Sequence, residues 1–130
     1  MKGYLFDTNI VITALVAPER ISTTVRSTVE GHPIYVSVLG YWEMLVKSMN
    51  GKLDLGDPRV RWTEAVDKLG AATLPLRPAH ISAVYDLPAI HKDPYDRALI
   101  GQAYIEELTL VTFDREIAKY RSEQIRILSA

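Results

Sequence analysis

The 130-residue sequence contains no cysteine, which excludes disulfides, thiolate zinc sites and cysteine nucleophiles and is typical of a reducing compartment. Its three histidines lie at separations that match no metal-binding motif. Long apolar runs are also missing: the longest, residues 10–17 with Thr13 included, has eight residues, whereas a membrane-spanning helix needs about 20. Asp7 lies where the apolar region of a signal peptide would be. These absences predict a cytoplasmic protein that is neither exported nor inserted in a membrane.

The sequence also lacks a strong excess of charge of either sign. It has 15 basic and 16 acidic residues and a net charge of -1, which by itself argues against nucleic-acid binding. If four of the acids form a metal site, 12 acids remain against 15 bases, and the rest of the surface carries +3. A weakly basic surface around a metal-neutralised acidic pocket is compatible with RNA.

Short apolar runs alternate with longer stretches of helical periodicity along the whole chain, which is typical of a parallel sheet wrapped by helices. The pattern predicts strands at residues 3–6, 34–37, 72–76, 110–112 and 125–128. It predicts helices at residues 9–16, 20–30, 39–49, 59–69, 79–87, 94–108 and 115–120, and a loop at 53–57. There is no internal repeat and no low-complexity linker. The sequence therefore predicts one α/β domain over residues 1–130.

Four carboxylates lie where an apolar segment reaches a predicted strand end or helix start: Asp7, Glu43, Asp96 and Asp114. Ionised carboxylates are rarely placed beside a core without a partner, and no lysine or arginine is an obvious partner for all four. Functional groups of open α/β sheets collect beyond the carboxyl ends of the strands. We therefore expect the four to converge at one edge of the sheet around a shared divalent cation, as the catalytic and metal-binding residues of a hydrolase.

Each of the four acids also has a purely structural interpretation. Asp93 reads as the N-cap of the helix that starts at residue 94, which would place Asp96 in its first turn, where an acid stabilises the helix dipole. Asp7 could begin a turn with Thr8 and Asn9, and Asp114 could cap the helix that begins at residue 115. Glu43 could pair with Lys47 one helical turn later. Four such coincidences at one edge are less probable than any one of them.

Two further residues stand beside the predicted site without a settled role. His91 can be a loop residue, a helix cap, a general base or an RNA contact. Arg97 is expected to point away from the core, and it could form a salt bridge to Glu43 or Asp93 or contact a phosphate. Glycine-rich phosphate loops, a G-x-S-x-G elbow and a dinucleotide fingerprint are all missing from the sequence.

At these residues the sequence resembles the PIN-domain ribonucleases, and among them the VapC-type toxins of toxin–antitoxin modules, over the whole chain. The run at residues 5–9, L-F-D-T-N, looks like the opening strand of the family, with Asp7 as the first catalytic acid and Asn9 as a residue that braces the site. Ser37 and Glu43 match the serine-to-glutamate segment, although the intermediate serine of many members is Gly40 here.

The most specific part of the resemblance is the block at residues 91–97, H-K-D-P-Y-D-R, which is similar to H-x-D-P-[FY]-D-R and makes Asp96 the third acid. Thr112 and Asp114 look like the final T-x-D. The resemblance implies a three-layer α/β/α fold with a mainly parallel sheet of four to five strands. It also implies a metal-dependent endoribonuclease that forms a homodimer and is inhibited by a cognate antitoxin whose tail blocks the site.

Carboxylate ligands without thiolates or paired imidazoles suit Mg²⁺ or Mn²⁺. Two such ions about 4 Å apart would activate water and stabilise the leaving 3′-oxygen. Asp7 is the expected bridging ligand, Thr112 and Asn9 would orient the carboxylates, and Asp93 would cap a helix with a secondary role in the site.

Two rival functions remain open on the sequence. A phosphohydrolase with Asp7 as nucleophile would need a second acid two residues later, where Asn9 stands. A noncatalytic interaction module on the same scaffold would have no reason to keep four acids.

Overall fold

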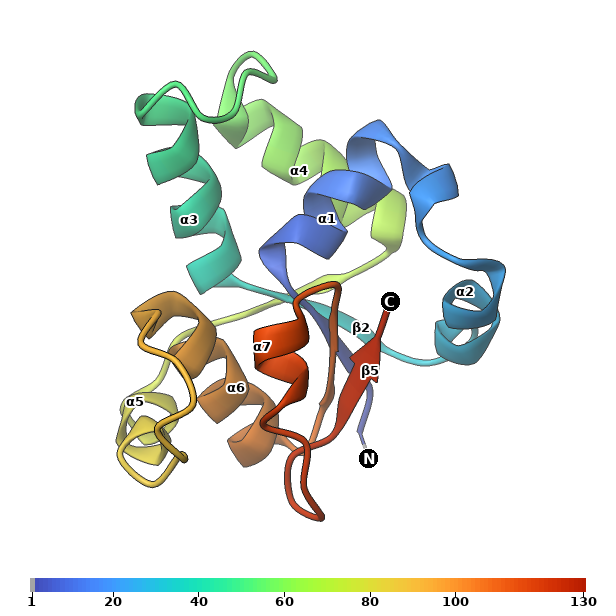
Figure 1. Ribbon diagram of the computed structural model, residues 1–130. Coiled ribbons are helices and arrows are strands. Elements are labelled where there is room, and N and C mark those ends of the chain that lie inside the picture. Colours follow the sequence, from blue (N-terminus) through green and yellow to red (C-terminus); the bar gives the residue numbers. More distant parts are fainter. Residues whose placement is uncertain (1) are drawn as a thin grey trace.

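The computed structural model describes residues 2–130, and its centre is a five-stranded sheet in the order β3-β2-β1-β4-β5 (Figure 1). Every neighbouring pair of strands is parallel. The strands are β1 (Tyr4–Phe6), β2 (Ile34–Ser37), β3 (Ala72–Leu74), β4 (Thr109–Thr112) and β5 (Ile127–Ser129). The prediction of an α/β protein with a central parallel sheet is confirmed.

Helices cover both faces of this sheet (Figure 1). They are α1 (Thr8–Val16), α2 (Thr23–Val29), α3 (Val38–Met49), α4 (Pro58–Leu69), α5 (Pro78–Val84), α6 (Pro94–Glu106) and α7 (Arg115–Ala118). Helices α1, α2 and α4 lie on one face and α6 and α7 on the other, with α5 packed outside α6. Helix α3 leaves the end of β2 and contacts α1, α4 and α6. No helix within residues 2–130 has the length and apolarity to cross a bilayer.

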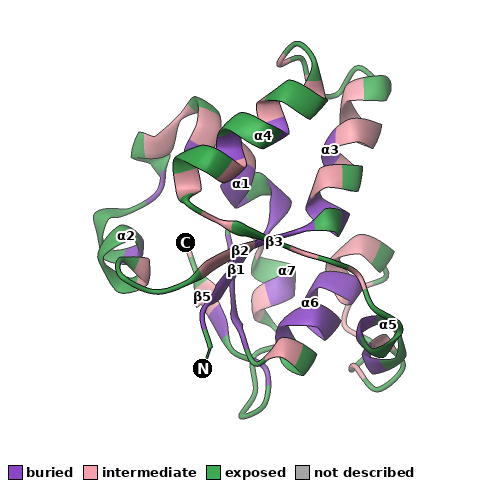
Figure 2. Cartoon of the chain, turned by 180° about the vertical axis from the view of Figure 1, so that it is seen from behind, coloured by how far each residue is buried: buried purple, intermediate pink, exposed green. Residues whose placement is uncertain are grey.

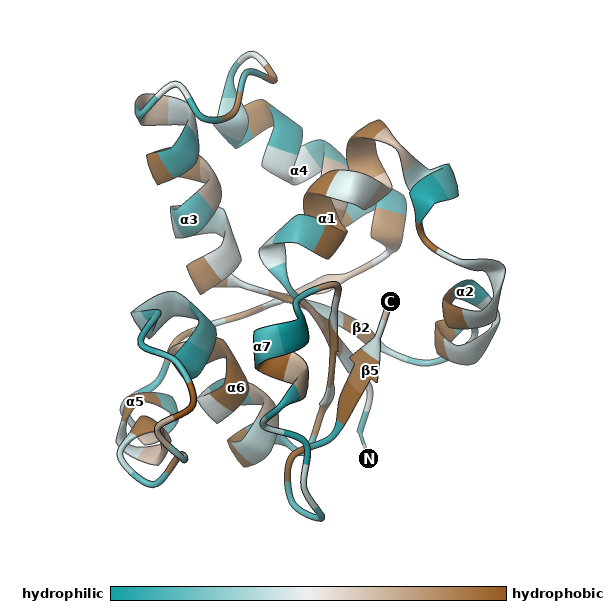
Figure 3. Cartoon of the chain, in the orientation of Figure 1, coloured by the Kyte–Doolittle hydropathy of each residue, from teal (hydrophilic) through white to brown (hydrophobic). Residues whose placement is uncertain are grey.

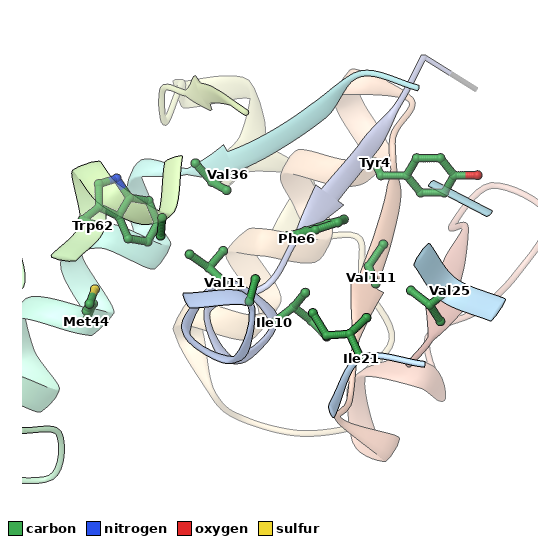
Figure 4. Packing of buried hydrophobic residues seen from close by; sticks show 12 residues of the cluster. Tyr4, Phe6, Ile10, Val11, Ile21, Val25, Val36, Met44, Trp62 and Val111 are labelled. Carbon is green, nitrogen blue, oxygen red and sulfur yellow. The ribbon is translucent and has the colours of Figure 1, made fainter. Parts of the chain in front are cut away.

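The two faces of β1 bury their side chains in two separate clusters. Tyr4 and Phe6 point into the cluster with α1, α2 and α4, where Trp62 also packs (Figure 4). Leu5 points into the opposite cluster, with Leu110 and the apolar side of α6. The central strands and the middle of α6 are accordingly buried, whereas α5 is largely exposed (Figure 2). Burial on both faces explains why the central strands read as continuous apolar runs.

Several predicted boundaries were wrong by two or three residues, and at three of them a side-chain hydrogen bond accompanies the difference. Helix α2 begins at residue 23, since residues 18–20 form a separate 3₁₀ turn and Ser22 Oγ accepts from the Val25 N–H. Helix α5 ends at residue 84, and the carbonyl of Val84 accepts from the Arg97 guanidinium. Strand β5 begins at residue 127, because the Ser122 hydroxyl holds the preceding residues in a turn.

Candidate active site

A polar pocket of about 240 Å³ lies at the carboxyl end of the sheet. The starts of α1, α6 and α7 are hydrophilic (Figure 3), and residues from these starts line the pocket. Its lining includes all four predicted acids. The complete set is Asp7, Thr8, Asn9, Leu39, Gly40, Glu43, Lys47, Asp93, Tyr95, Asp96, Leu99, Asp114 and Ile117. The pocket therefore brings together residues from four helices that are far apart in the sequence.

Asp7 follows β1 directly and is the most buried of the four acids, with 6% of its surface exposed. One carboxylate oxygen, Oδ1, accepts from the Ile10 N–H at 3.0 Å and so caps α1. The other, Oδ2, accepts from the Thr112 hydroxyl at the end of β4. One oxygen is thus fixed by the first turn of α1 and the other by the end of β4, and the carboxylate has one defined orientation.

Thr112 connects the first acid to the last. Its hydroxyl donates to Asp7 and accepts from the Asp114 N–H at 3.0 Å. Asp114 then caps α7, because its Oδ1 accepts from the N–H groups of Glu116 and Ile117 at 2.7 and 3.4 Å. The structural interpretation of Asp114 as a helix cap is therefore correct, whereas Asp7, for which a turn was the structural alternative, caps α1; both residues still line the pocket.

Asp96 lies in the first turn of α6, with a fifth of its side chain exposed. The N-cap of this helix is Asp93, whose Oδ1 accepts from the N–H groups of Tyr95 and Asp96 at 2.9 and 3.3 Å. Capping by Asp93 leaves the Asp96 carboxylate free of that duty. The interpretation of Asp93 as the N-cap agrees with these hydrogen bonds, and the role of Asp96 as a site acid stays a prediction.

Glu43 projects from the middle of α3 and has 21% of its side chain exposed. Its Oε2 lies 3.4 Å from the Nζ of Lys47, so the alternative of a pair one helical turn apart is also realised. Gly40, one turn earlier, leaves room for the Trp62 ring, since an added Cβ would lie 3.1 Å from it. Helix α3 can therefore approach both the pocket and α4 closely.

The electrostatics of the pocket are those of crowded carboxylates. Burial raises the pKa of Asp7 to about 6, with smaller contributions from the charges of Glu43 and Asp114 and opposition from its hydrogen bonds. Burial likewise raises the pKa of Asp96 to about 7, assisted by the charges of Asp93, Glu43 and Asp114. The N-termini of α1 and α6 carry partial positive charge that offsets part of this repulsion. A bound cation would offset the remainder.

The residues present fit a hard divalent cation because their donors are carboxylate oxygens. Within residues 2–130, however, no three histidine or acidic side chains are yet close enough to ligate one ion together. Asp7 is held in place at both oxygens, whereas Glu43 and Asp96 are partly exposed side chains whose rotamers can change. Metal binding would therefore require these two, and Asp114 through its uncapped side, to turn toward Asp7.

The remaining predicted residues are distributed inside and outside the pocket. Asn9 lines it from the first turn of α1. His91 Nε2 lies 3.4 Å from the Asp96 carboxylate, and its charge lowers the pKa of that group. Arg97 does not line the pocket: its guanidinium donates to the carbonyls of Val84, Leu87 and Pro88 and to the Tyr120 hydroxyl. The structure therefore does not bring Arg97 to Glu43 or Asp93.

Ser37 belongs to a buried polar network that the sequence reasoning missed. Its hydroxyl accepts from the Leu39 N–H at 3.0 Å, capping α3, and donates to Gln102 Oε1 at 2.5 Å. Gln102 also donates to the Pro75 carbonyl at 3.3 Å. The detectable signal was a single glutamine in the fully buried stretch at residues 98–103, because a polar side chain there requires partners.

His80 continues the network toward the surface. Its Nδ1 accepts from the Arg77 N–H at 3.0 Å, and its Nε2 lies 2.6 Å from Glu106 Oε2. The first contact leaves the proton on Nε2, so the neutral ring donates to Glu106. The Gln102 Nε2 lies 3.5 Å from the His80 Nδ1. Through this contact the network ties the start of α3, the helix that carries Glu43, to α5 and α6.

Replacing Ser37 by alanine should lower the unfolding free energy by about 2–3 kcal/mol, because it removes a helix cap and leaves a buried amide oxygen without its donor. Ser22→Ala is the matched control, since Ser22 caps α2 in the same way without a buried partner, and should cost about 1 kcal/mol. Urea denaturation measures both. Equal losses would show that the Gln102 contact contributes nothing.

The sequence matches the family model of the PIN domain over residues 4–123, and the chain therefore belongs to the PIN-domain family. No curated protein matches the sequence. Among solved structures, the fold is similar to that of VapBC2 from Rickettsia felis bound to a promoter DNA fragment (TM-score 0.73, 14% identity, 98% of both chains). It is also similar to DNA-bound VapBC from Salmonella typhimurium (0.70, 19%, 99% of this chain and 98% of that one).

A third likeness is to VapBC-5 from Mycobacterium tuberculosis, described as a member of a toxin–antitoxin family (TM-score 0.66, 15% identity, all of both chains). At these identities the likeness shows a shared fold. The prediction of a PIN-like α/β fold is confirmed, with a sheet of five parallel strands.

Proposed function

We propose that this protein is a divalent-metal-dependent endoribonuclease, the toxin of a toxin–antitoxin module that acts in the cytoplasm. The observation that carries the proposal is the convergence of four carboxylates from four segments on one pocket, with the pKa values of Asp7 and Asp96 raised. Burial, assisted by the neighbouring negative charges, disfavours the ionised forms of both groups in the protein alone, and a bound cation would favour them.

The chain's own residues then have distinct tasks. Asp7, fixed at both oxygens, would provide the immobile ligand, and Glu43, Asp96 and Asp114 would complete the coordination of Mg²⁺ or Mn²⁺. Thr112 holds Asp7 and Asp114 in register through its single hydroxyl. When bound, the metal supplies an activated water and charge stabilisation at the phosphate.

The rival phosphohydrolase fits the geometry less well. Asn9, at the position of the second acid, lines the pocket with an amide that cannot act as a general acid or base.

Incubation with structured RNA, single-stranded DNA and a phosphomonoester, each with and without Mn²⁺, separates the alternatives. We expect internal cleavage of RNA only when Mn²⁺ is present, and loss of that cleavage in Glu43→Gln.

Release of phosphate from the monoester would favour the phosphohydrolase. Inactivity on all three substrates would favour a noncatalytic module.

Two partners belong to this proposal. The structurally similar proteins are toxin–antitoxin complexes, and we propose a cognate antitoxin for this chain, to be identified by co-purification of the product of the neighbouring gene.

We also propose a homodimer, because Trp42 and Met49 on α3 are exposed apolar side chains, at 54% and 83%. Light scattering at micromolar concentration should report the dimer; a strict monomer contradicts it.

A further inference from the structure

The candidate active site contains one basic side chain that the carboxylate chemistry does not use. Among residues 2–130, Lys47 is the only lysine or arginine that lines the pocket, whereas five carboxylates line it. Its ammonium lies 3.4 Å from Glu43 Oε2, and a third of its side chain is exposed. The side chain is thus at the boundary between the acidic interior and solvent.

The ion pair with Glu43 is too weak to hold the Lys47 ammonium in one position. A pair one helical turn apart on a partly exposed surface contributes only about 0.3–0.5 kcal/mol. Lysine carries its charge on a flexible stem of four carbons, so the ammonium can leave this contact with little loss. A metal ion that engages Glu43 would neutralise the carboxylate and repel the ammonium, which would turn it outward to solvent.

A polyanionic substrate creates the need for such a cation. Each phosphate of an RNA strand brings a negative charge toward a pocket lined by Asp7, Glu43, Asp93, Asp96 and Asp114. Arg97, the nearest alternative suggested by the sequence, already donates to three carbonyls and to Tyr120. Lys47 remains as the lining residue with a cation available to a second phosphate.

We propose that Lys47 binds the RNA phosphate next to the one at which the strand is cleaved. Its ion pair with Glu43 is the position of the same side chain in the absence of RNA. This inference rests on the proposed ribonuclease function and adds to it a substrate-binding residue outside the carboxylate set. Since the contact is made to the backbone, it contributes affinity independent of base sequence.

The test compares three variants. Lys47→Met keeps the length of the stem and removes the charge, and Lys47→Arg keeps the charge. Lys119→Met is the matched control, because Lys119 also pairs with a glutamate three residues earlier, at 2.8 Å, but lies outside the pocket. Binding of a fluorescein-labelled single-stranded RNA is measured by anisotropy at saturating Mn²⁺ and several salt concentrations, in the Asp96→Asn background to prevent cleavage. KM and kcat are measured in the otherwise wild-type protein.

Lys47→Met should raise Kd and KM about fivefold or more at low salt and reduce the slope of log Kd against log salt by about 0.7, the value for one phosphate contact on a single strand. The kcat should stay within about twofold, because the contact is equally strong with the bound substrate and with the transition state. Lys47→Arg and Lys119→Met should bind as the parent protein does.

Unchanged Kd and salt dependence in Lys47→Met would overturn the inference. A fall in kcat with unchanged Kd and altered Mn²⁺ affinity would also overturn it, by showing that Lys47 only positions Glu43. Wild-type protein that cleaves RNA while Lys47→Met binds normally would refute the role of Lys47 alone. Wild-type protein that neither binds nor cleaves RNA would refute the ribonuclease function and the role of Lys47 together.

Discussion

Asp96→Asn should reduce Mn²⁺-dependent RNA cleavage by about two to three orders of magnitude or more, the range seen when one group that stabilises transition-state charge is removed. The asparagine has nearly the same shape but carries no charge, so it weakens the binding of the cation and with it the charge stabilisation that the cation would supply. The Asp96 carboxylate is free for this role, because Asp93 already satisfies the N–H groups at the start of α6. Initial rates at saturating Mn²⁺ measure the effect.

Asp93→Asn is the matched control, three residues away on the same helix. Asparagine caps a helix about as well as aspartate, so most of the activity should remain. The charge of Asp93 contributes to the raised pKa of Asp96, so its removal should lower that pKa and move the acidic limb of the pH–rate profile to lower pH. Equal losses in both variants would remove the distinction between cap and ligand, and full activity in Asp96→Asn would refute the assignment of the site.

The order of strands and helices was predictable because both faces of the sheet are buried. Leu5, between Tyr4 and Phe6, is as apolar as its neighbours, and this continuous pattern distinguishes a central parallel strand from a half-exposed one. The four acids were predictable for the same reason, since each interrupts or follows an apolar segment. Their local geometry was harder to predict from the sequence. Asp7 and Asp114 are both helix caps and pocket residues, whereas the sequence pattern suggested that each residue would have only one of these roles.

Contacts between distant segments could not be read from the sequence. The Thr112 hydroxyl joins Asp7 across 105 positions, and Ser37 meets Gln102 across 65. Arg97 was expected near acids or phosphate, yet its guanidinium is satisfied by carbonyls left free where α5 ends early. In each case the side chain's chemistry was evident, but its partner depends on how the layers pack.

Asp7→Asn should leave the metal-free protein as stable as the wild type or more stable at neutral pH, while the stabilisation by Mn²⁺ shrinks or vanishes. In the folded protein the pKa of Asp7 is about 6, against 3.8 for the ordinary aspartate. Between these values the folded state binds more protons than the unfolded state, so the free energy of unfolding falls as pH rises from about 4 to about 6. The loss is on the order of 3 kcal/mol for Asp7, and Asp96 extends the same trend to about pH 7.

Asparagine cannot ionise, so the free energy of unfolding of the variant does not fall in this way as the pH rises from about 4 to about 6. Its side-chain oxygen can still accept from the Ile10 N–H, so the cap of α1 is retained. Wild type and variant should therefore differ little at pH 4.5 and diverge in favour of the variant at pH 7.5. Melting temperatures of the metal-free proteins across this range test the sign.

Metal addition supplies the second half of the test. A cation that binds only the folded state adds about 2.7 kcal/mol at a free concentration 100 times its Kd, so Mn²⁺ or Mg²⁺ should raise the melting temperature of the wild type most clearly at pH 7.5, where the carboxylates are ionised. At pH 4.5 protons compete for the same oxygens, and the increase should be small. If Asp7→Asn instead melts several degrees lower without metal and responds to Mn²⁺ as the wild type does, Asp7 serves only as a helix cap, and the carboxylates around it do not bind the metal.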